Sequence, residues 1–226
     1  MPSLSEIFPP FGLSVAAGSM ELRVLRDDDL PELVDLVAAG VADPALPMPF
    51  RAAWHEEPLD LGGPRGFPTE SLRWWWSQRA ACASDEWWLA LVVRAEGRIV
   101  GLQDVHAVDF PLTRTVETGS WLGREHHGRG LGTLMRRLAV GLALDELDAE
   151  CCVSAYIEGN AASAAVSRKV GYVDGERVRI VQRRRGERTA AWEQRVVVTR
   201  DTYVRPEEPV RIEGAAAVRR FLGIER

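Results

Sequence analysis

The spacing of apolar positions along the chain predicts a mixture of helices and strands. Apolar residues recur roughly every three to four positions in four segments, which predicts helices at 30–39, 69–83, 131–142 and 161–170. Segments rich in β-branched and aromatic residues predict strands at 21–25, 87–94, 98–107, 115–122, 150–157, 177–183 and 192–199. Strands interleaved with helices in this order predict an α+β, or mixed α/β, sheet.

The series of elements shows no linker, so we expect one domain. Its predicted bounds are 21–204, with an irregular lead-in at 1–20 and a C-terminal tail at 205–226. The segment Asp43–Pro68 is rich in Pro and Gly, and a loop of this length inside a domain is either functional or disordered. The last two strands are expected to form a hairpin with its tip at Arg184–Ala190.

Composition excludes several classes of protein. With 46% hydrophobic and 27% charged residues, the chain is neither collagen-like nor disordered. A net charge of −5 argues against DNA as a partner. No apolar run approaches the roughly 18 residues of a membrane span, and the start lacks a signal peptide, so a cytoplasmic protein without membrane contact is expected. The Arg-rich, Lys-poor composition is typical of a GC-rich bacterial genome.

The three cysteines give no disulfide or metal pattern. Cys82 stands alone, while Cys151 and Cys152 are adjacent, which is not the spacing of a Cys-x-x-Cys metal site. No metal is therefore expected. Cys152 on a strand has no adjacent base, so packing is favoured over a nucleophilic role.

The segment most informative about chemistry is the glycine-rich run after the strand at 115–122. It reads Gly128-Arg129-Gly130-Leu131-Gly132-Thr133 and opens a helix, so bare backbone N–H groups and the positive end of the helix dipole form a cradle for an anion. The Lys-Ser/Thr of a P-loop is missing, and a dinucleotide fingerprint belongs near the first βαβ unit. The pyrophosphate of coenzyme A is the favoured ligand, with a pyridine dinucleotide or ATP as the alternative.

A second motif follows the next strand, and the two together resemble a known family. It runs from Asn160 through Ser163 and Ser167 to Gly171-Tyr172. The pair resembles the GNAT superfamily of acyl-CoA-dependent N-acyltransferases, whose first motif, Gln/Arg-x-x-Gly-x-Gly/Ala, is matched by His127–Gly132. The run Glu117–Gly123 looks most like the RimJ/RimL-like branch, which acetylates N-terminal amines of ribosomal proteins. The resemblance covers about residues 20–199.

The resemblance implies a fold and a donor site. The GNAT fold has a central mixed, mostly antiparallel sheet with a splayed strand pair and helices on both faces. Acetyl-CoA or another acyl-CoA would be the co-substrate. The strand at 115–122 would bulge, and there the backbone of Ser120, Trp121 and Leu122 would pair with the pantetheine arm. One of these N–H groups would point at the thioester carbonyl. Pyrophosphate would be held by His127, Gly128, Arg129, Gly130, Leu131, Gly132 and Thr133.

Further donor contacts are implied in the same way. Asn160 would bond pantetheine or an ordered water, and Arg129 or Arg136 would neutralise phosphate. A longer donor such as succinyl-CoA needs extra room or a cationic partner near the thioester, which the sequence alone does not locate.

The resemblance also implies direct attack by an amine on the thioester in a ternary complex. Many relatives place a Tyr where this chain has Ser167, and some place a Glu where it has Ala155. Ser163 and Ser167 are the hydroxyls left to meet the thiolate, and Glu117 is the best-placed carboxylate for a base. The alternatives are that Glu117 holds the sheet edge and that Ser163 belongs to a helix cap.

The acceptor is expected to be a primary amine, on a protein N-terminus or a lysine. A small amine of the aminoglycoside type is the second reading, and a non-catalytic CoA-binding sensor or interaction module is the third. The arginines at the expected hairpin tip are expected to be exposed to solvent. The alternative is that they recognise a carboxylate on the acceptor or on the acyl donor. The tryptophans between Trp74 and Trp88 are expected in core packing and in the contact of a homodimer, with an acceptor-pocket wall as the alternative.

Overall fold

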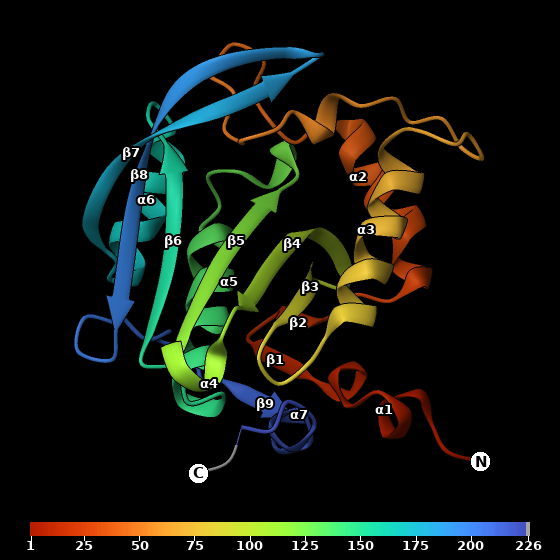
Figure 1. The fold of residues 1–226 in the computed structure, drawn as a ribbon, viewed down its shortest axis with the longest axis vertical. Helices are drawn as coiled ribbons and strands as arrows, with labels where there is room; N and C mark the ends of the chain where they lie inside the picture. Colours follow the sequence, from red (N-terminus) through yellow and green to blue (C-terminus); the bar gives the residue numbers. More distant parts are fainter. Residues whose placement is uncertain (225–226) are drawn as a thin grey trace.

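The computed structural model describes residues 1–224 and contains a nine-stranded sheet in the order β7-β8-β6-β5-β4-β3-β2-β1-β9 (Figure 1). All neighbours are antiparallel except β5 and β6, which are parallel. The strands are β1 (Ser14–Ala17), β2 (Met20–Val24), β3 (Trp87–Ala95), β4 (Arg98–Ala107), β5 (Thr115–Leu122), β6 (Cys151–Ile157), β7 (Val173–Arg184), β8 (Glu187–Thr199) and β9 (Arg211–Glu213).

Four longer helices cover the two faces of this sheet (Figure 1). One face carries α2 (Leu30–Ala39) and α3 (Phe67–Ala81), which pack on β4 and β3. The other carries α6 (Ala161–Val170) and α5 (Leu131–Gly141), which continues into the π-helical segment η5 (Leu142–Glu146). The mixed, mostly antiparallel sheet with helices on both faces confirms the predicted fold class.

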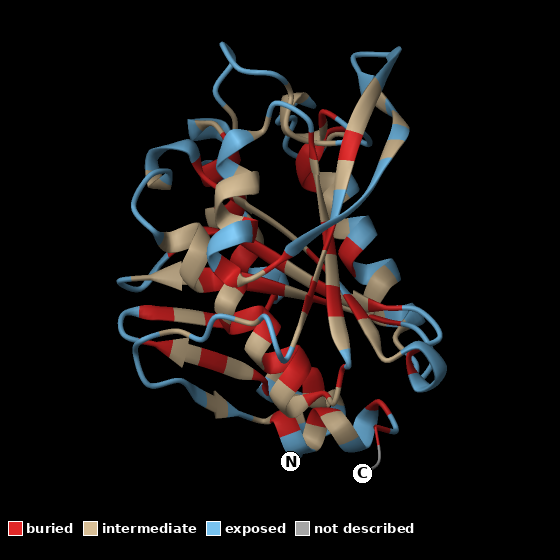
Figure 2. Ribbon diagram, turned by 90° about the vertical axis from the view of Figure 1, so that its left-hand side faces the viewer, coloured by how far each residue is buried: buried red, intermediate tan, exposed pale blue. Residues whose placement is uncertain are grey.

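Alternation along the strands divides the core between these two faces (Figure 2). Leu89, Leu91 and Val105 point toward α5 and join the main cluster with Leu138, while Val92 points the other way toward α2 and α3. Strands β3 and β4 are therefore buried on both sides, as expected for central strands between two helical layers. The tightly buried ladder fixes the register of the strands that carry the site.

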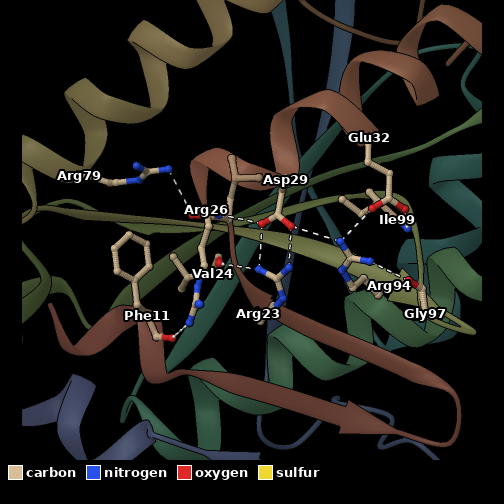
Figure 3. A network of polar contacts seen from close by, with 11 residues as sticks. Phe11, Arg23, Val24, Arg26, Asp29, Glu32, Arg79, Arg94, Gly97 and Ile99 are labelled. Atoms are coloured by element: carbon tan, nitrogen blue, oxygen red, sulfur yellow. Dashed lines mark hydrogen bonds and ion pairs between the residues drawn. The ribbon is translucent and has the colours of Figure 1, made fainter. Parts of the chain in front are cut away.

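A buried ion-pair network attaches α2 to the sheet (Figure 3). Asp29, only 3% exposed, accepts from Arg23 at 2.8 and 2.6 Å, from Arg94 at 3.2 Å and from the Arg26 N–H at 2.8 Å. Burial opposes ionisation of Asp29, but these partners outweigh it and hold the pKa of Asp29 below its usual value. Glu32 extends the network by accepting from the Ile99 N–H and Arg94.

Both chain ends contribute to the sheet, which differs from the expected irregular lead-in and tail. After α1 (Leu4–Ile7) and η1 (Pro9–Gly12), strand β1 pairs with β2, and β9 pairs with β1. Helix α7 (Ala215–Phe221) then buries Val218 completely. These strands are only a few residues long, and their sequence pattern is too brief to separate them from a loop. The bounds of the domain itself stay a prediction.

Strands β7 and β8 form an arm longer than predicted, because they run to Arg184 and start again at Glu187. The expected tip at Arg184–Ala190 is wrong, since all but Arg185 and Gly186 lie in strands. The arm is tied to the Pro-rich loop: Ala53 and Arg51 exchange backbone hydrogen bonds with Arg183. Short turns complete the chain at η2 (Asp27–Asp29), η3 (Trp54–Glu56), α4 (Phe110–Thr113) and η4 (Arg124–His126).

Residues 1–224 contain neither a membrane-spanning helix nor a cluster of metal-ligating side chains. No helix there is long and apolar enough to cross a membrane. Within the same residues, no group of three or more His, Cys, Asp or Glu side chains is placed to hold a metal ion.

Candidate functional site

The glycine-rich turn leads from η4 into the N-terminus of α5. Gly128 and Gly130 have φ of +74° and +81°, a left-handed conformation that favours glycine. A Cβ built on either glycine would meet no atom within 4 Å. Packing within the protein therefore does not explain why these two positions lack a side chain. The N–H groups of residues 128–132 find no acceptor in the described chain. This combination of free donors and open space at a helix N-terminus fits a phosphate group.

Strands β5 and β6 separate beside this turn. Their parallel pairing is limited to Thr115, Val116 and Glu117 of β5, opposite Cys151–Val153. After that point β6 pairs only with β8, and β5 only with β4. The backbone of Gly119–Leu122 thus has one unpaired side, which faces the gap between the two strands.

The expected bulge in β5 is absent. The register between β4 and β5 is continuous, from His106 opposite Glu117 to Gly101 opposite Leu122. Separation from β6, rather than an extra residue, frees the outer edge of β5. Alternation sends the Ser120 side chain toward α5 and the Trp121 side chain to the opposite face, where its ring centroid lies 5.1 Å from that of Trp54.

The predicted donor-binding residues fall on both sides of this gap. His127 lies just before the turn, but its N–H bonds the Arg124 carbonyl and its Nε2 lies 3.1 Å from the Leu122 carbonyl oxygen. Arg129 is exposed on the turn itself. Thr133 begins the hydrogen bonding of α5 by donating to the Gly130 carbonyl. The roles assigned to these residues stay predictions.

Arg136 does not lie at the glycine-rich turn, so the prediction that it would neutralise phosphate there is wrong. It is buried on the face of α5 that points at the strand gap. Its Nη2 donates to the Ser120 hydroxyl at 2.6 Å and its Nη1 to the Ser154 hydroxyl at 3.1 Å. Ser154 in turn donates to the Thr118 carbonyl. The guanidinium therefore bridges β5 and β6 where they part.

The second motif forms the N-terminus and the end of α6. The Asn160 side chain accepts from the Ser163 N–H at 3.0 Å and caps the helix. Ser163 is partly exposed beside that cap, whereas Ser167 is only 3% exposed. At the other end Gly171, with φ of +98°, ends the helix and directs the buried Tyr172 hydroxyl to within 2.7 Å of the Thr118 hydroxyl.

An acid–base cluster, consisting of Trp88, Asp104, His106 and Glu117, occupies the opposite face of β3, β4 and β5. The His106 ring stacks on Trp88 with centroids 4.2 Å apart, and its Nε2 lies 3.7 Å from a Glu117 carboxylate oxygen. Trp88 Nε1 donates to Asp104 at 3.0 Å. The Glu117 side chain is 55% exposed, so its carboxylate is open to solvent.

Burial tunes two members of this cluster. It lowers the pKa of His106, and the charges of Glu117 and Glu86 oppose that shift. It also raises the pKa of Asp104 to about 6, against the hydrogen bond from Trp88. At neutral pH the imidazole is therefore mostly neutral beside the exposed Glu117, which leaves a proton acceptor on each of two adjacent strands.

The Pro-rich loop supplies groups that the sequence did not point to. Arg51 donates its Nε to Glu193 at 2.6 Å, and Glu193 on β8 is only 2% exposed. Trp54 packs between Trp121 and Phe50, with ring centroids 5.1 and 5.2 Å away. These partners lie far apart in sequence, so no local pattern pairs them.

The tryptophan-rich segment is divided between core and surface. Trp75 and Trp87 are buried, as expected for core packing, while Trp74 and Trp76 are about half exposed on α3. Trp76 bonds Asp27, and Trp74 meets Trp88 edge to face at 5.5 Å. The helix thus supports the back of the acid–base cluster.

Comparison with known proteins identifies the family. Residues 19–173, more than half of the chain, match the family described as "Acetyltransferase (GNAT) domain". The chain belongs to the GNAT family of acyl-CoA-dependent N-acyltransferases. The predicted resemblance to this family is therefore confirmed.

The chain is similar to one curated relative over part of its length and to several solved structures. Over 84 residues the chain is 27% identical to "Putative ribosomal N-acetyltransferase YdaF" of Bacillus subtilis (strain 168), which covers 37% of this chain. The match spans 45% of that relative, a little under half its length. The solved structure "Mycobacterium smegmatis RimJ in complex with CoA-disulfide" has a TM-score of 0.65 at 17% identity, covering 92% of this chain and 91% of that one.

A second solved structure has the same fold. RimL, described as a ribosomal L7/L12 alpha-N-protein acetyltransferase, has a TM-score of 0.62 at 15% identity, covering 82% of this chain and 93% of that one. At these identities the likeness concerns the fold.

Proposed function

We propose that this protein transfers an acyl group from acyl-CoA to a primary amine, with a protein N-terminus as the leading acceptor and a lysine as the next. The observation that carries the proposal is the strand gap beside the glycine-rich turn. One unpaired edge of β5, next to free N–H groups at a helix N-terminus, suits an extended donor with a pyrophosphate at its end. The likeness to RimJ, RimL and YdaF favours a protein N-terminus.

The donor is held mainly by backbone in this proposal. The N–H groups of Gly128–Gly132 bind pyrophosphate, and the free edge of Gly119–Leu122 pairs with pantetheine. The Ser120 N–H then donates to the thioester carbonyl oxygen and stabilises the negative charge that develops there. His127 supports the arrangement by holding the Leu122 carbonyl. Asn160 acts through the cap of α6 rather than by direct contact.

The acceptor enters from the face that carries the acid–base cluster. Glu117, with His106 behind it, removes a proton from the incoming ammonium. The amine nitrogen then bonds to the carbonyl carbon and loses its second proton to water, the carbon–sulfur bond breaks, and the thiolate of CoA takes a proton from solvent or from the Ser163 hydroxyl, which solvent then reprotonates. Ser167 is too buried to meet the thiolate directly. Positioning accounts for most of the rate enhancement in such a scheme.

The decisive experiment measures CoA binding by calorimetry for the wild type and Gly130→Glu. Wild type is expected to bind CoA, and the variant to lose binding, because its carboxylate would occupy the phosphate position in space that is open in the protein. Gly186→Glu, at another left-handed glycine with open space on the β7–β8 tip, is the matched control. Retained CoA affinity in Gly130→Glu would contradict the assignment of the turn.

Turnover is tested in the same series by thiol release with N-terminal peptides, lysine peptides and small amines. Glu117→Gln is expected to slow release about 10²-fold while CoA binding is unchanged, since general-base catalysis contributes on that order. Glu150→Gln, an exposed change at the start of β6, serves as control. Binding of CoA without release for every acceptor would favour a non-catalytic CoA-binding module, and release with small amines alone would exclude the peptide acceptor.

A further inference from the structure

Arg136 is a buried cation whose charge the protein does not neutralise. Only 4% of the residue is exposed, yet no carboxylate in residues 1–224 lies within ion-pair distance of it. Its guanidinium donates to two neutral hydroxyls, on Ser120 and Ser154. Its Nε is buried and has no hydrogen-bond partner among the described residues.

The groups around this guanidinium are also neutral. Burial raises the pKa of both the Cys152 thiol and the Tyr172 phenol, so neither supplies a negative charge at neutral pH. The Tyr172 ring, whose centroid lies 6.0 Å from the guanidinium carbon, offers only a weak cation–π contact. Burying a charge without a counter-charge is costly, so this arrangement calls for an anion from outside the chain.

The position of Arg136 indicates which anion that would be. It sits at the strand gap, bonded to the side chain of Ser120, the residue whose N–H meets the thioester in the proposed function. In the proposed function phosphate binds elsewhere, at the exposed turn before α5. Because the guanidinium bonds Ser120 on β5 and Ser154 on β6, an acyl chain that extended from the thioester between these strands would meet it.

We propose that Arg136 binds a carboxylate at the far end of the acyl group, so that the preferred donor is a short dicarboxylic acyl-CoA such as succinyl-CoA. The inference rests on the proposed function and specifies its donor. The Arg136 Nε–H has no partner within residues 1–224, and Nη2 on the same side of the guanidinium donates to the Ser120 hydroxyl. A carboxylate that displaces this hydroxyl would find in Nε–H and Nη2–H the planar fork that takes two parallel hydrogen bonds. The transfer step is unchanged: the carbon–nitrogen bond forms, the carbon–sulfur bond breaks, and the distal carboxylate stays ionised.

The test compares donors of equal length that differ in the carboxylate. Affinities of succinyl-CoA, butyryl-CoA and free CoA are measured by calorimetry without acceptor, for the wild type, Arg136→Met and Arg137→Met. Wild type is expected to prefer succinyl-CoA over butyryl-CoA by about 10- to 100-fold, the range of one charge-assisted interaction. Arg136→Met is expected to remove this preference and to leave free CoA affinity unchanged. Arg137→Met, next along α5 and bonded to the Lys169 carbonyl, is expected to keep the preference.

Each outcome separates this inference from the function on which it rests. Binding of free CoA with equal affinity for succinyl-CoA and butyryl-CoA in the wild type overturns the donor assignment alone. An equal loss of all three ligands in Arg136→Met overturns it as well, because the residue would then support the groove rather than the carboxylate. No binding of any CoA species by the wild type would overturn the proposed function. The wild-type preference is decisive even if Arg136→Met fails to fold.

Discussion

Two buried charges in this molecule are treated in opposite ways. Asp29, at the start of α2, is surrounded by Arg23, Arg94 and a backbone N–H, and its pKa is held below its usual value (Figure 3). Arg136, on α5, is equally buried, but within residues 1–224 its guanidinium bonds only to hydroxyls and lies near one aromatic ring. The charge of Asp29 is neutralised within the fold, whereas that of Arg136 has no counter-charge among the described residues, which is the basis for proposing a ligand there.

The difference indicates what each part of the sheet does. The Asp29 network lies where β2, β3 and β4 are fully paired, and it fixes a helix to them. Arg136 lies where β5 and β6 have lost their pairing. The unpaired backbone of β5 and the charge of Arg136, which has no counter-charge among the described residues, therefore lie at the same place. This is why we propose that the acyl-CoA donor binds there.

The largest effect on stability is expected at Asp29. Asp29→Ala leaves Arg23 and Arg94 without their shared carboxylate and should cost about 3 kcal/mol, the lower end for a broken buried pair because both arginines are partly exposed. Asp28→Ala, at an exposed neighbour, is the control and should change stability by less than about 0.5 kcal/mol. Urea denaturation measures both. A loss no larger than the control would show that the network is not stabilising.

The matching change at Arg136 should act in the other direction. Without ligand, Arg136→Met removes an uncompensated charge and replaces it with an apolar chain of similar length, so the free energy of unfolding should rise by about 1 to 2 kcal/mol. Arg220→Met, at an exposed position of α7, is the control. If Arg136→Met were as destabilising as Asp29→Ala, the two charges would be equivalent structural groups and the contrast would fail.

A smaller, pH-dependent effect is expected at Asp104, a partly buried acid bonded by Trp88 but lacking a cation. Its pKa of about 6 lies above the ordinary 3.8, so the folded state holds this proton more tightly. That contribution to stability is present below pH 4 and is lost as pH rises through 6. Asp104→Asn should match the wild type at pH 4 and exceed it by about 1 to 2 kcal/mol at pH 7.

The measurement is urea denaturation of both proteins across pH 4 to 7. Asp85→Asn, at an exposed aspartate, is the control for loss of a charge. A difference between Asp104→Asn and the wild type that does not change with pH would show that Asp104 titrates normally in the folded protein.

Long amphipathic and β-rich segments made most of the fold predictable. The predicted bounds of the helix at 30–39 and of the strands at 98–107 and 115–122 agree with α2, β4 and β5, because each has strong periodicity and clear ends. The short strands β1 and β9 were missed, since three or four residues carry too little pattern. The location in the cytoplasm and the homodimer stay predictions.

The site was only partly predictable for a different reason. The glycine-rich turn is a local feature, so its place at the N-terminus of α5 followed from sequence. The contact of His106 with Glu117 depends on the register of two strands. The contact of Arg51 with Glu193 forms only when the folded chain brings two segments together that lie far apart in sequence. The lack of a counter-charge beside Arg136 among the described residues could not be predicted at all, because it depends on which groups surround the guanidinium in the folded chain.

The gap between β5 and β6 also bears on association between molecules. Unpaired strand edges invite other chains to add on, and proteins usually shield them at the rim of a sheet with short strands or charge. Here β9, at one rim, has only three residues, and β7, at the other, carries several arginines. The unpaired edge of β5 instead lies in the middle of the sheet, with β6 next to it and α5 packed on β5 (Figure 1). A second protein strand would have to pass these elements to pair with it. The protein can thus keep an open hydrogen-bonding edge without the aggregation risk that such an edge carries at the rim.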